Sequence, residues 1–139
     1  MELLANGSMP FVSIENNSTS LKNFFSYCFA CKTGIKLGRE IGDQGALGFI
    51  GYNNDVKIQY MYFGALDSFV DVAVKGIESF INHKTIKQTI IDMKNSYTHY
   101  MDEYYKKNMI IASMFMDNRD CLVAHGNLNL SISDFIILY

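Results

Sequence analysis

The sequence predicts an α/β domain, a three-layer sandwich in which helices cover a mostly parallel β-sheet. Short apolar runs with the character of buried strands alternate with amphipathic helical segments along the chain. This alternation is typical of a parallel sheet packed between helices. In addition, the apolar run at residues 46–51 has no polar interruption, as expected for a strand that is covered on both faces.

The composition fits one compact domain spanning residues 1–139. Apolar residues make up 49% of the chain and aromatic residues 14%, which is ample material for a core at this length. The net charge is −2 without a long basic run, so binding to nucleic acid through phosphate neutralisation is not expected. No apolar segment approaches the ~20 residues that span a bilayer, and no secretory signal is visible. We therefore expect no membrane partner and a cytoplasmic protein.

The first elements are short. Residues 3–5 form an apolar run that ends at the turn residues Asn6, Gly7 and Ser8. A polar loop at 15–20 contains Ser18 and Thr19, either of which can cap a short helix. Residues 26–30 then have the aromatic, apolar character of a buried strand.

A glycine-rich helix is predicted over residues 33–43. Gly34, Gly38 and Gly42 recur every four residues along it, and each costs about 1 kcal/mol of helix propensity relative to alanine. This cost is understandable if the glycine stripe lies close against a sheet. The helix is followed by the apolar strand at 46–51.

Two long amphipathic helices are the clearest predictions, at residues 66–82 and 85–107. Both repeat apolar residues with helical spacing. A strand is predicted at 121–124, and the alternating tail at 128–139 could form another.

The predicted strand ends direct attention to Cys31. In parallel α/β sheets, ligands bind beyond the carboxyl ends of the strands, so residues 6–8, 31–33 and 52–53 should share one edge. Cys31 is either a nucleophile at this edge or a small buried hydrophobic residue, as free cysteines commonly are. Cys28 and Cys31 also form a C-x-x-C pair. A zinc site needs further ligands nearby, but the histidines are scattered, so we expect neither metal nor cofactor.

The order of these motifs resembles the catalytic half of caspase-like cysteine peptidases, in particular the bacterial CHAT (caspase-HetF-associated) and gingipain-type branch. The resemblance rests on ACKTG at 30–34, LGREIGDQGALGFIGY at 37–52 and DNRDCLVAHGN at 117–127. It implies a caspase-like fold and a cysteine endopeptidase that acts on peptides or proteins. It also implies that the chain lacks the first strands of that fold, which leaves a sheet edge for a second copy or another chain to complete.

The resemblance assigns roles to particular residues. It places Cys31 at the nucleophile position, where the N-terminus of a following helix would favour the thiolate. The N–H groups of Cys31 and Gly7 would form the oxyanion hole, and Asp55 could select a basic substrate side chain. The family's general base, however, is a histidine at the position held here by Asn6. Asparagine cannot accept the proton, and a triad without its base loses orders of magnitude in rate.

Three hypotheses follow. The chain is a caspase-like peptidase domain that is incomplete or catalytically impaired, a non-enzymatic binding or regulatory module on the same fold, or a flavodoxin-like ligand-binding domain. Asn6 favours the second hypothesis over an active peptidase. The third lacks a glycine-rich phosphate loop. A substitute base is conceivable at His83, His99 or His125, of which His125 ends a predicted strand.

Overall fold

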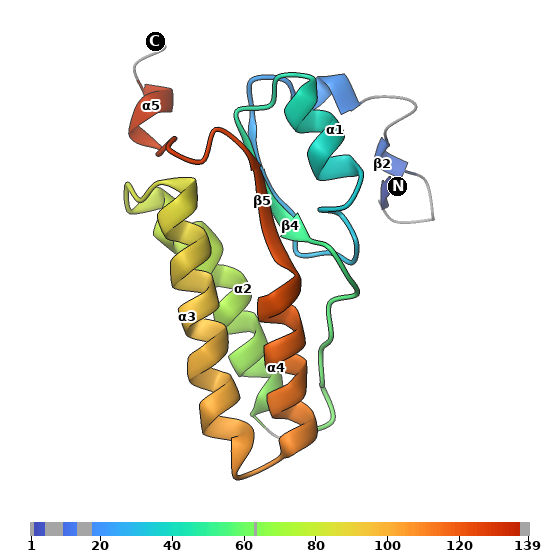
Figure 1. The fold of residues 1–139 in the computed structure, drawn as a ribbon, viewed down its shortest axis with the longest axis vertical. Coiled ribbons are helices and arrows are strands. Elements are labelled where there is room, and N and C mark those ends of the chain that lie inside the picture. The colour runs from blue at the N-terminus through green and yellow to red at the C-terminus, as the bar shows by residue number, and fades with distance from the viewer. Residues whose placement is uncertain (1, 5–9, 14–17, 63, 137–139) are drawn as a thin grey trace.

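The computed structural model describes residues 2–4, 10–13, 18–62 and 64–136. Within these ranges the chain is an α/β protein with five α-helices and a three-stranded mixed sheet (Figure 1). The elements in chain order are β1 (Glu2–Leu4), β2 (Pro10–Ser13), a 3-10 helix (Ser18–Leu21), β3 (Phe25–Tyr27), α1 (Leu37–Asp43), β4 (Gly48–Tyr52), α2 (Ala65–Ile81), α3 (Ile86–Tyr105), α4 (Met109–Cys121), β5 (Leu122–Gly126) and α5 (Ser133–Ile136). None of these helices is long and apolar enough to cross a membrane.

The sheet has the order β3-β4-β5. β3 pairs parallel with β4, with Tyr27 opposite Ile50, whereas β5 pairs antiparallel with β4, with Ala124 opposite Ile50. The sheet is therefore mixed rather than mostly parallel. Its third strand has the opposite direction because α4 runs straight into β5 and the strand continues the course of the helix (Figure 1).

The N-terminal strand differs from the prediction. We expected the strand near residues 3–5 to lie parallel beside the strand at 26–30. Instead β1 pairs antiparallel with β2 in a separate two-stranded sheet. The two segments are close in sequence, and short antiparallel pairs need no long crossover connection.

Both faces of the three-stranded sheet are covered. On one face, Phe49 of β4 packs with Leu37 and Ile41 of α1 in a fully buried cluster. On the other face, Ile50 and Tyr52 point into the core beneath α2 and α3. This alternation is the side-chain period of a strand. It explains why the predicted apolar run at 46–51 has no polar residue.

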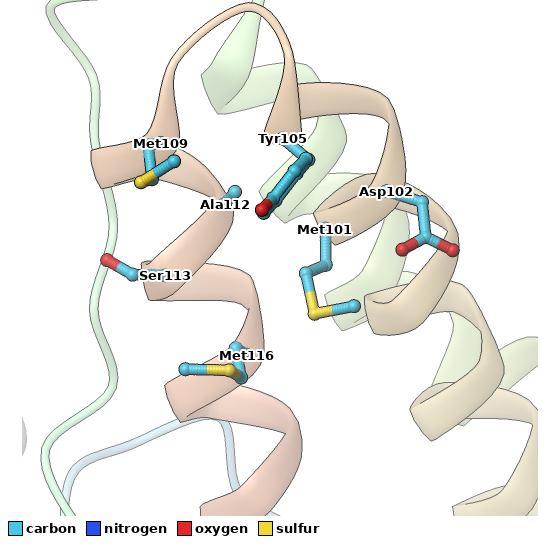
Figure 2. A pocket seen from close by; sticks show the side chains of 7 residues that line it. All are labelled: Met101, Asp102, Tyr105, Met109, Ala112, Ser113 and Met116. Atoms are coloured by element: carbon cyan, nitrogen blue, oxygen red, sulfur yellow. The ribbon is translucent and has the colours of Figure 1, made fainter.

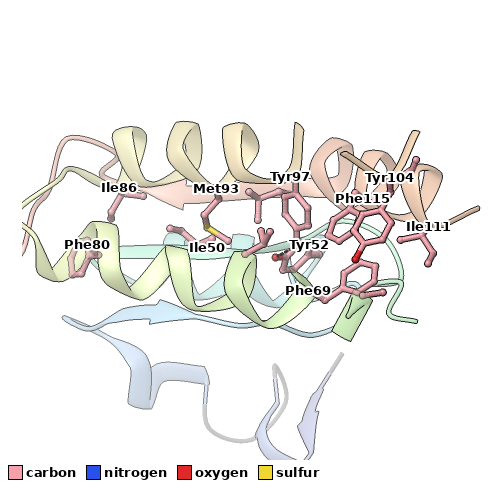
Figure 3. Close-up of a cluster of buried hydrophobic side chains, with 14 residues drawn as sticks. Ile50, Tyr52, Phe69, Phe80, Ile86, Met93, Tyr97, Tyr104, Ile111 and Phe115 are labelled. Carbon is pink, nitrogen blue, oxygen red and sulfur yellow. Dashed lines mark hydrogen bonds between the residues drawn. The ribbon is translucent and has the colours of Figure 1, made fainter. Parts of the chain in front are cut away.

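The larger core lies between the sheet and the helices α2, α3 and α4 (Figure 3). The rings of Phe69 and Phe115 stack with their centroids 4.1 Å apart. The hydroxyls of Tyr52 and Tyr97 form a 2.9 Å hydrogen bond inside this apolar core, and burial raises the pKa of both phenols above the ordinary tyrosine value. Each hydroxyl thus satisfies the other where water has no access.

Other boundaries confirm or correct the predictions. The long helices at 66–82 and 85–107 are confirmed as α2 and α3, and the strand at 46–51 as β4. The predicted helix at 33–43 begins only at Leu37, after a series of turns. The helix α4 was not predicted at all. In the described part of the tail, a short helix, α5, replaces the possible strand.

Candidate functional site

Cys31 is exposed and lies beyond the carboxyl end of β3. Its Sγ accepts a hydrogen bond from the backbone N–H of Val56 at 3.3 Å. The turn that carries Cys31 is tied to the end of β4 as well. The N–H of Lys32 donates to the carbonyl of Asn54 at 3.0 Å, and the N–H of Gly34 to the carbonyl of Tyr52 at 2.8 Å. The predicted meeting of 31–33 with 52–53 at one sheet edge is therefore present.

A buried asparagine on α4 positions the loop that contacts the thiol. Asn118 is fully buried, and its amide oxygen accepts from the N–H of Lys57 at 2.8 Å while its amide nitrogen donates to the carbonyl of Lys57 at 2.7 Å. This pair of bonds fixes the main chain next to Val56. The sequence analysis identified neither Asn118 nor Lys57 as part of this site. The only local sign was that Asn118 is a polar residue on the inward face of an apolar helix, and this does not identify Lys57 as its hydrogen-bond partner.

The residue after the cysteine has an unusual backbone conformation. Lys32 has a φ of 58°, in the left-handed region that non-glycine residues seldom occupy. Next to it, Thr33 is buried, and its hydroxyl donates to the carbonyl of Ala30 at 3.0 Å. Strained backbone of this kind is often found at functional sites. The turn therefore presents Cys31 to solvent at the cost of local strain.

Asp55 lies in the same region and forms an ion pair. Its carboxylate is 3.2 Å from the Lys32 Nζ, and both side chains are about half exposed. Asp55 also lines a polar hollow of about 380 Å³, together with Asp117 and Asp120. The nearby Lys57 pairs with Asp117. Two of the three carboxylates thus already have a lysine partner within the chain.

The position of α1 changes the expected environment of the thiol. The helix was expected to begin next to Cys31, but it begins at Leu37. The helix macrodipole falls off within the first turn, and the turns at 31–36 separate the cysteine from it. The helix N-terminus therefore does not act on Cys31 as proposed from the sequence.

The described histidines make their contacts elsewhere. The Nε2–H of His125 donates to the carbonyl of Gly34 at 2.8 Å, which orients the ring by a main-chain bond. His83 contacts the hydroxyl of Ser133 at 2.8 Å, and His99 packs on a tyrosine ring in α3. Among the described residues, no histidine hydrogen-bonds to Cys31. Asn6 and Gly7 lie outside the described residues.

The other two cysteines differ from Cys31. Cys28 is half-buried beside the α1 core, and burial raises the pKa of its thiol to about 11. Burial also raises the pKa of the Cys121 thiol, whose Sγ donates to the carbonyl of Asn118 at 3.4 Å. In the part of the chain that the structure describes, no group of three or more potential metal ligands comes together.

A second hollow lies between the end of α3 and the start of α4. Figure 2 shows the Tyr105 ring and Met101 from α3 facing the side chains of α4. The cavity measures about 400 Å³ and is mainly apolar, with Met109 and Met116 in its lining and Asp102 at its border. Its side chains offer packing surface but no arrangement of nucleophile and base.

The fold defines an α/β protein with a mixed sheet and an exposed cysteine at one sheet edge. Comparison of the chain with protein-family models, with curated proteins and with solved structures found no match.

Proposed function

We propose that this chain is a caspase-like domain of the cysteine-peptidase type whose catalysis is impaired, with Cys31 at the nucleophile position. In this proposal the layers around β3, β4 and β5 correspond to a caspase-like three-layer sandwich. The observation that carries the proposal is the exposed Cys31 thiol at the end of β3, held beside the loop after β4. A thiol presented at the carboxyl edge of the sheet is accessible to a peptide carbonyl.

The impairment has a chemical basis. Thiolate attack on a peptide requires a group that removes the thiol proton and returns a proton to the leaving amine. Among the described residues, the Cys31 sulfur bonds to the N–H of Val56, which cannot act as a base, and the nearby His125 ring bonds to Gly34. Asn6, which takes the place of the family histidine, cannot accept a proton either. The expected catalytic rate is therefore very low.

A non-enzymatic binding module is the second candidate. The polar hollow beside Asp55 and the exposed edge around Cys31 could hold a peptide without cleaving it. The flavodoxin-like alternative receives less support, because the sequence has no glycine-rich phosphate loop.

Alkylation and gain of function test the proposal. Iodoacetamide labelling followed by mass spectrometry should modify Cys31 well before Cys28 and Cys121, with Cys31→Ser as the control. Asn6→His should then create peptide hydrolysis that is lost in the Asn6→His, Cys31→Ser double variant. If Asn6→His folds normally yet hydrolyses no member of a mixed peptide library, the peptidase assignment is wrong. Peptide binding by the unaltered chain would then support the second candidate.

A further inference from the structure

The outer side of α2 carries an uninterrupted apolar stripe. Its members follow one another by about one helical turn, and each is between 43% and 53% exposed: Leu66, Val70, Val74, Ile77 and Ile81. A helix on the surface of a globular domain normally turns polar residues towards water. A contiguous apolar surface of this kind is a sign of an interaction site.

The stripe lies on the side of α2 that is turned away from α3. α3 packs against the buried side of α2, where the Ser79 hydroxyl donates to the Asp92 carboxylate at 2.9 Å. The next residue, Phe80, lies about 100° further round the helix, and its ring stacks on Phe25 of β3 with centroids 4.0 Å apart. From the 3.6-residue helical repeat, the stripe adjoins the Phe80 side. The exposed apolar surface therefore continues from the contact with β3 outwards.

Beneath this stripe, β3 is the edge strand of its sheet. The carbonyl of Phe24 accepts from the N–H of Leu47, just before β4, at 3.0 Å, and the N–H of Cys28 donates to the carbonyl of Ile50 in β4 at 2.9 Å. Because backbone groups alternate along a strand, those of Phe25 and Tyr27 point away from β4. No other described strand pairs with them. Such an edge is a template for pairing with another chain.

We propose that a second copy of this chain binds to this α2–β3 surface, defined as the five-residue stripe together with the outer edge of β3. The two β3 strands pair antiparallel, and the two α2 helices pack antiparallel above them. A two-fold interface requires a surface that complements itself. An axis at residues 73–74 sets Leu66 against Ile81 of the second copy, and Val70 against Ile77 of the second copy, so apolar side chains meet throughout.

The strand and the helix are compatible with the same axis. A two-fold axis beside Tyr27 lets its outward N–H and C=O bond to the same groups of the second copy. The Tyr27 hydroxyl donates to the carbonyl of Ala73 at 2.8 Å, so the side chain of this strand residue reaches the middle of α2.

The size of the surface is also appropriate. Five aliphatic residues that are about half exposed contribute about 400 Å², roughly half of the ~800 Å² that each partner buries in a standard interface. The edge of β3 and the residues around the stripe supply further area. No member of the stripe is charged, so a second copy covers it without burying an unpaired charge.

Light scattering and sedimentation equilibrium test the proposal across concentration. The chain should form a dimer, and Val74→Glu should weaken it at least about 100-fold, because two like charges meet at the axis. Ile110→Glu is the matched control: this side chain is 68% exposed on α4, outside the stripe, and its change should leave the dimer intact. A chain that stays monomeric at all concentrations, or a dimer indifferent to Val74→Glu, overturns the proposal.

Cysteine crosslinking keeps the test valid if Val74→Glu fails to fold. In a background with the three native cysteines replaced by alanine, Val74→Cys should crosslink with itself. A mixture of Val70→Cys and Ile77→Cys chains should crosslink with each other in preference to Val70→Cys alone. Ile110→Cys should stay monomeric under the same conditions. Preferential self-crosslinking of Val70→Cys would contradict the antiparallel packing. These results do not depend on the chemistry of Cys31.

Discussion

Replacing Gly38 with alanine tests how closely α1 lies against the sheet. A Cβ at this position would overlap the ring carbons Cδ1 and Cε1 of Phe49, and the Phe49 ring is fully buried. Gly42, one turn later in the same helix, is the matched control. A Cβ there would be 3.8 Å from its nearest neighbours, which is ordinary van der Waals contact.

The two substitutions should change stability in opposite directions. Overpacking at Gly38 costs typically ~1–3 kcal/mol, and the better helix propensity of alanine returns up to ~1 kcal/mol. Gly38→Ala should therefore lower the free energy of unfolding by about 1 kcal/mol and at most by about 3 kcal/mol. Gly42→Ala has only the propensity gain and should raise the free energy of unfolding by up to about 1 kcal/mol.

Urea unfolding followed by circular dichroism measures both values, with unchanged slopes as the sign that only the native state is affected. In a chain of this size, 1 kcal/mol corresponds to a shift of about 3–5 °C in Tm. A Gly38→Ala protein as stable as Gly42→Ala would refute the close contact between α1 and β4. It would also remove our explanation for the glycine stripe.

Further measurements probe the core, the thiols and the charges. Tyr97→Phe should cost ~0.5–1.5 kcal/mol because it removes the buried hydrogen bond to the Tyr52 hydroxyl, which keeps the Tyr27 hydroxyl as a second neighbour; the effects of Tyr52→Phe and Tyr97→Phe should not be additive in a double-mutant cycle. Iodoacetamide should modify Cys28 slowly at pH 8 and faster towards pH 11, since burial raises its pKa to about 11; fast labelling at pH 8 would contradict this burial. Burial raises the pKa of Asp92, but hydrogen bonds, chiefly from Lys84, outweigh it and lower the pKa below the ordinary value. The stabilisation from Asp92 should thus be present above pH ~4 and be lost as the pH falls through the folded-state pKa, and Asp92→Asn should flatten that part of a stability–pH curve.

The long helices could be predicted because their apolar spacing is local information. α4 could not be recognised in the same way. Its N-terminus does carry a signal, since Asn108 caps the helix by accepting from the N–H groups of Ile110 and Ile111 at 3.1 and 3.3 Å. However, its inward face ends in Asn118, which interrupts the apolar pattern. The side chain is stable there only because a loop far away in the sequence completes its hydrogen bonds.

The candidate site shows the same division between local and long-range information. From the sequence alone, the end of the predicted aromatic strand at 26–30 indicated that Cys31 lies at a sheet edge. The sequence could not predict that α1 would begin only at Leu37, because the turn before it is stabilised by bonds to Tyr52 and Asn54 of another segment. Nor could it identify Val56 as the partner of the sulfur. The direction of β5 likewise depends on the tertiary course of α4.

The proposed dimer leaves the Cys31 thiol accessible, although it occupies the edge of β3 where the family resemblance would place the strand before Asn6. β3 leads directly to Cys31, so a partner at the strand edge has to leave room for access to the thiol. In an antiparallel pair about Tyr27, however, the two strands run in opposite directions, and the two Cys31 residues lie at opposite ends of the pair. The sulfur is also anchored on the β4 side of the strand by Val56, away from the outer edge that the second copy would occupy. Cys31 should therefore be labelled at the same rate in the dimer and in the Val74→Glu monomer, and slower labelling in the dimer would show that the second copy binds at another place.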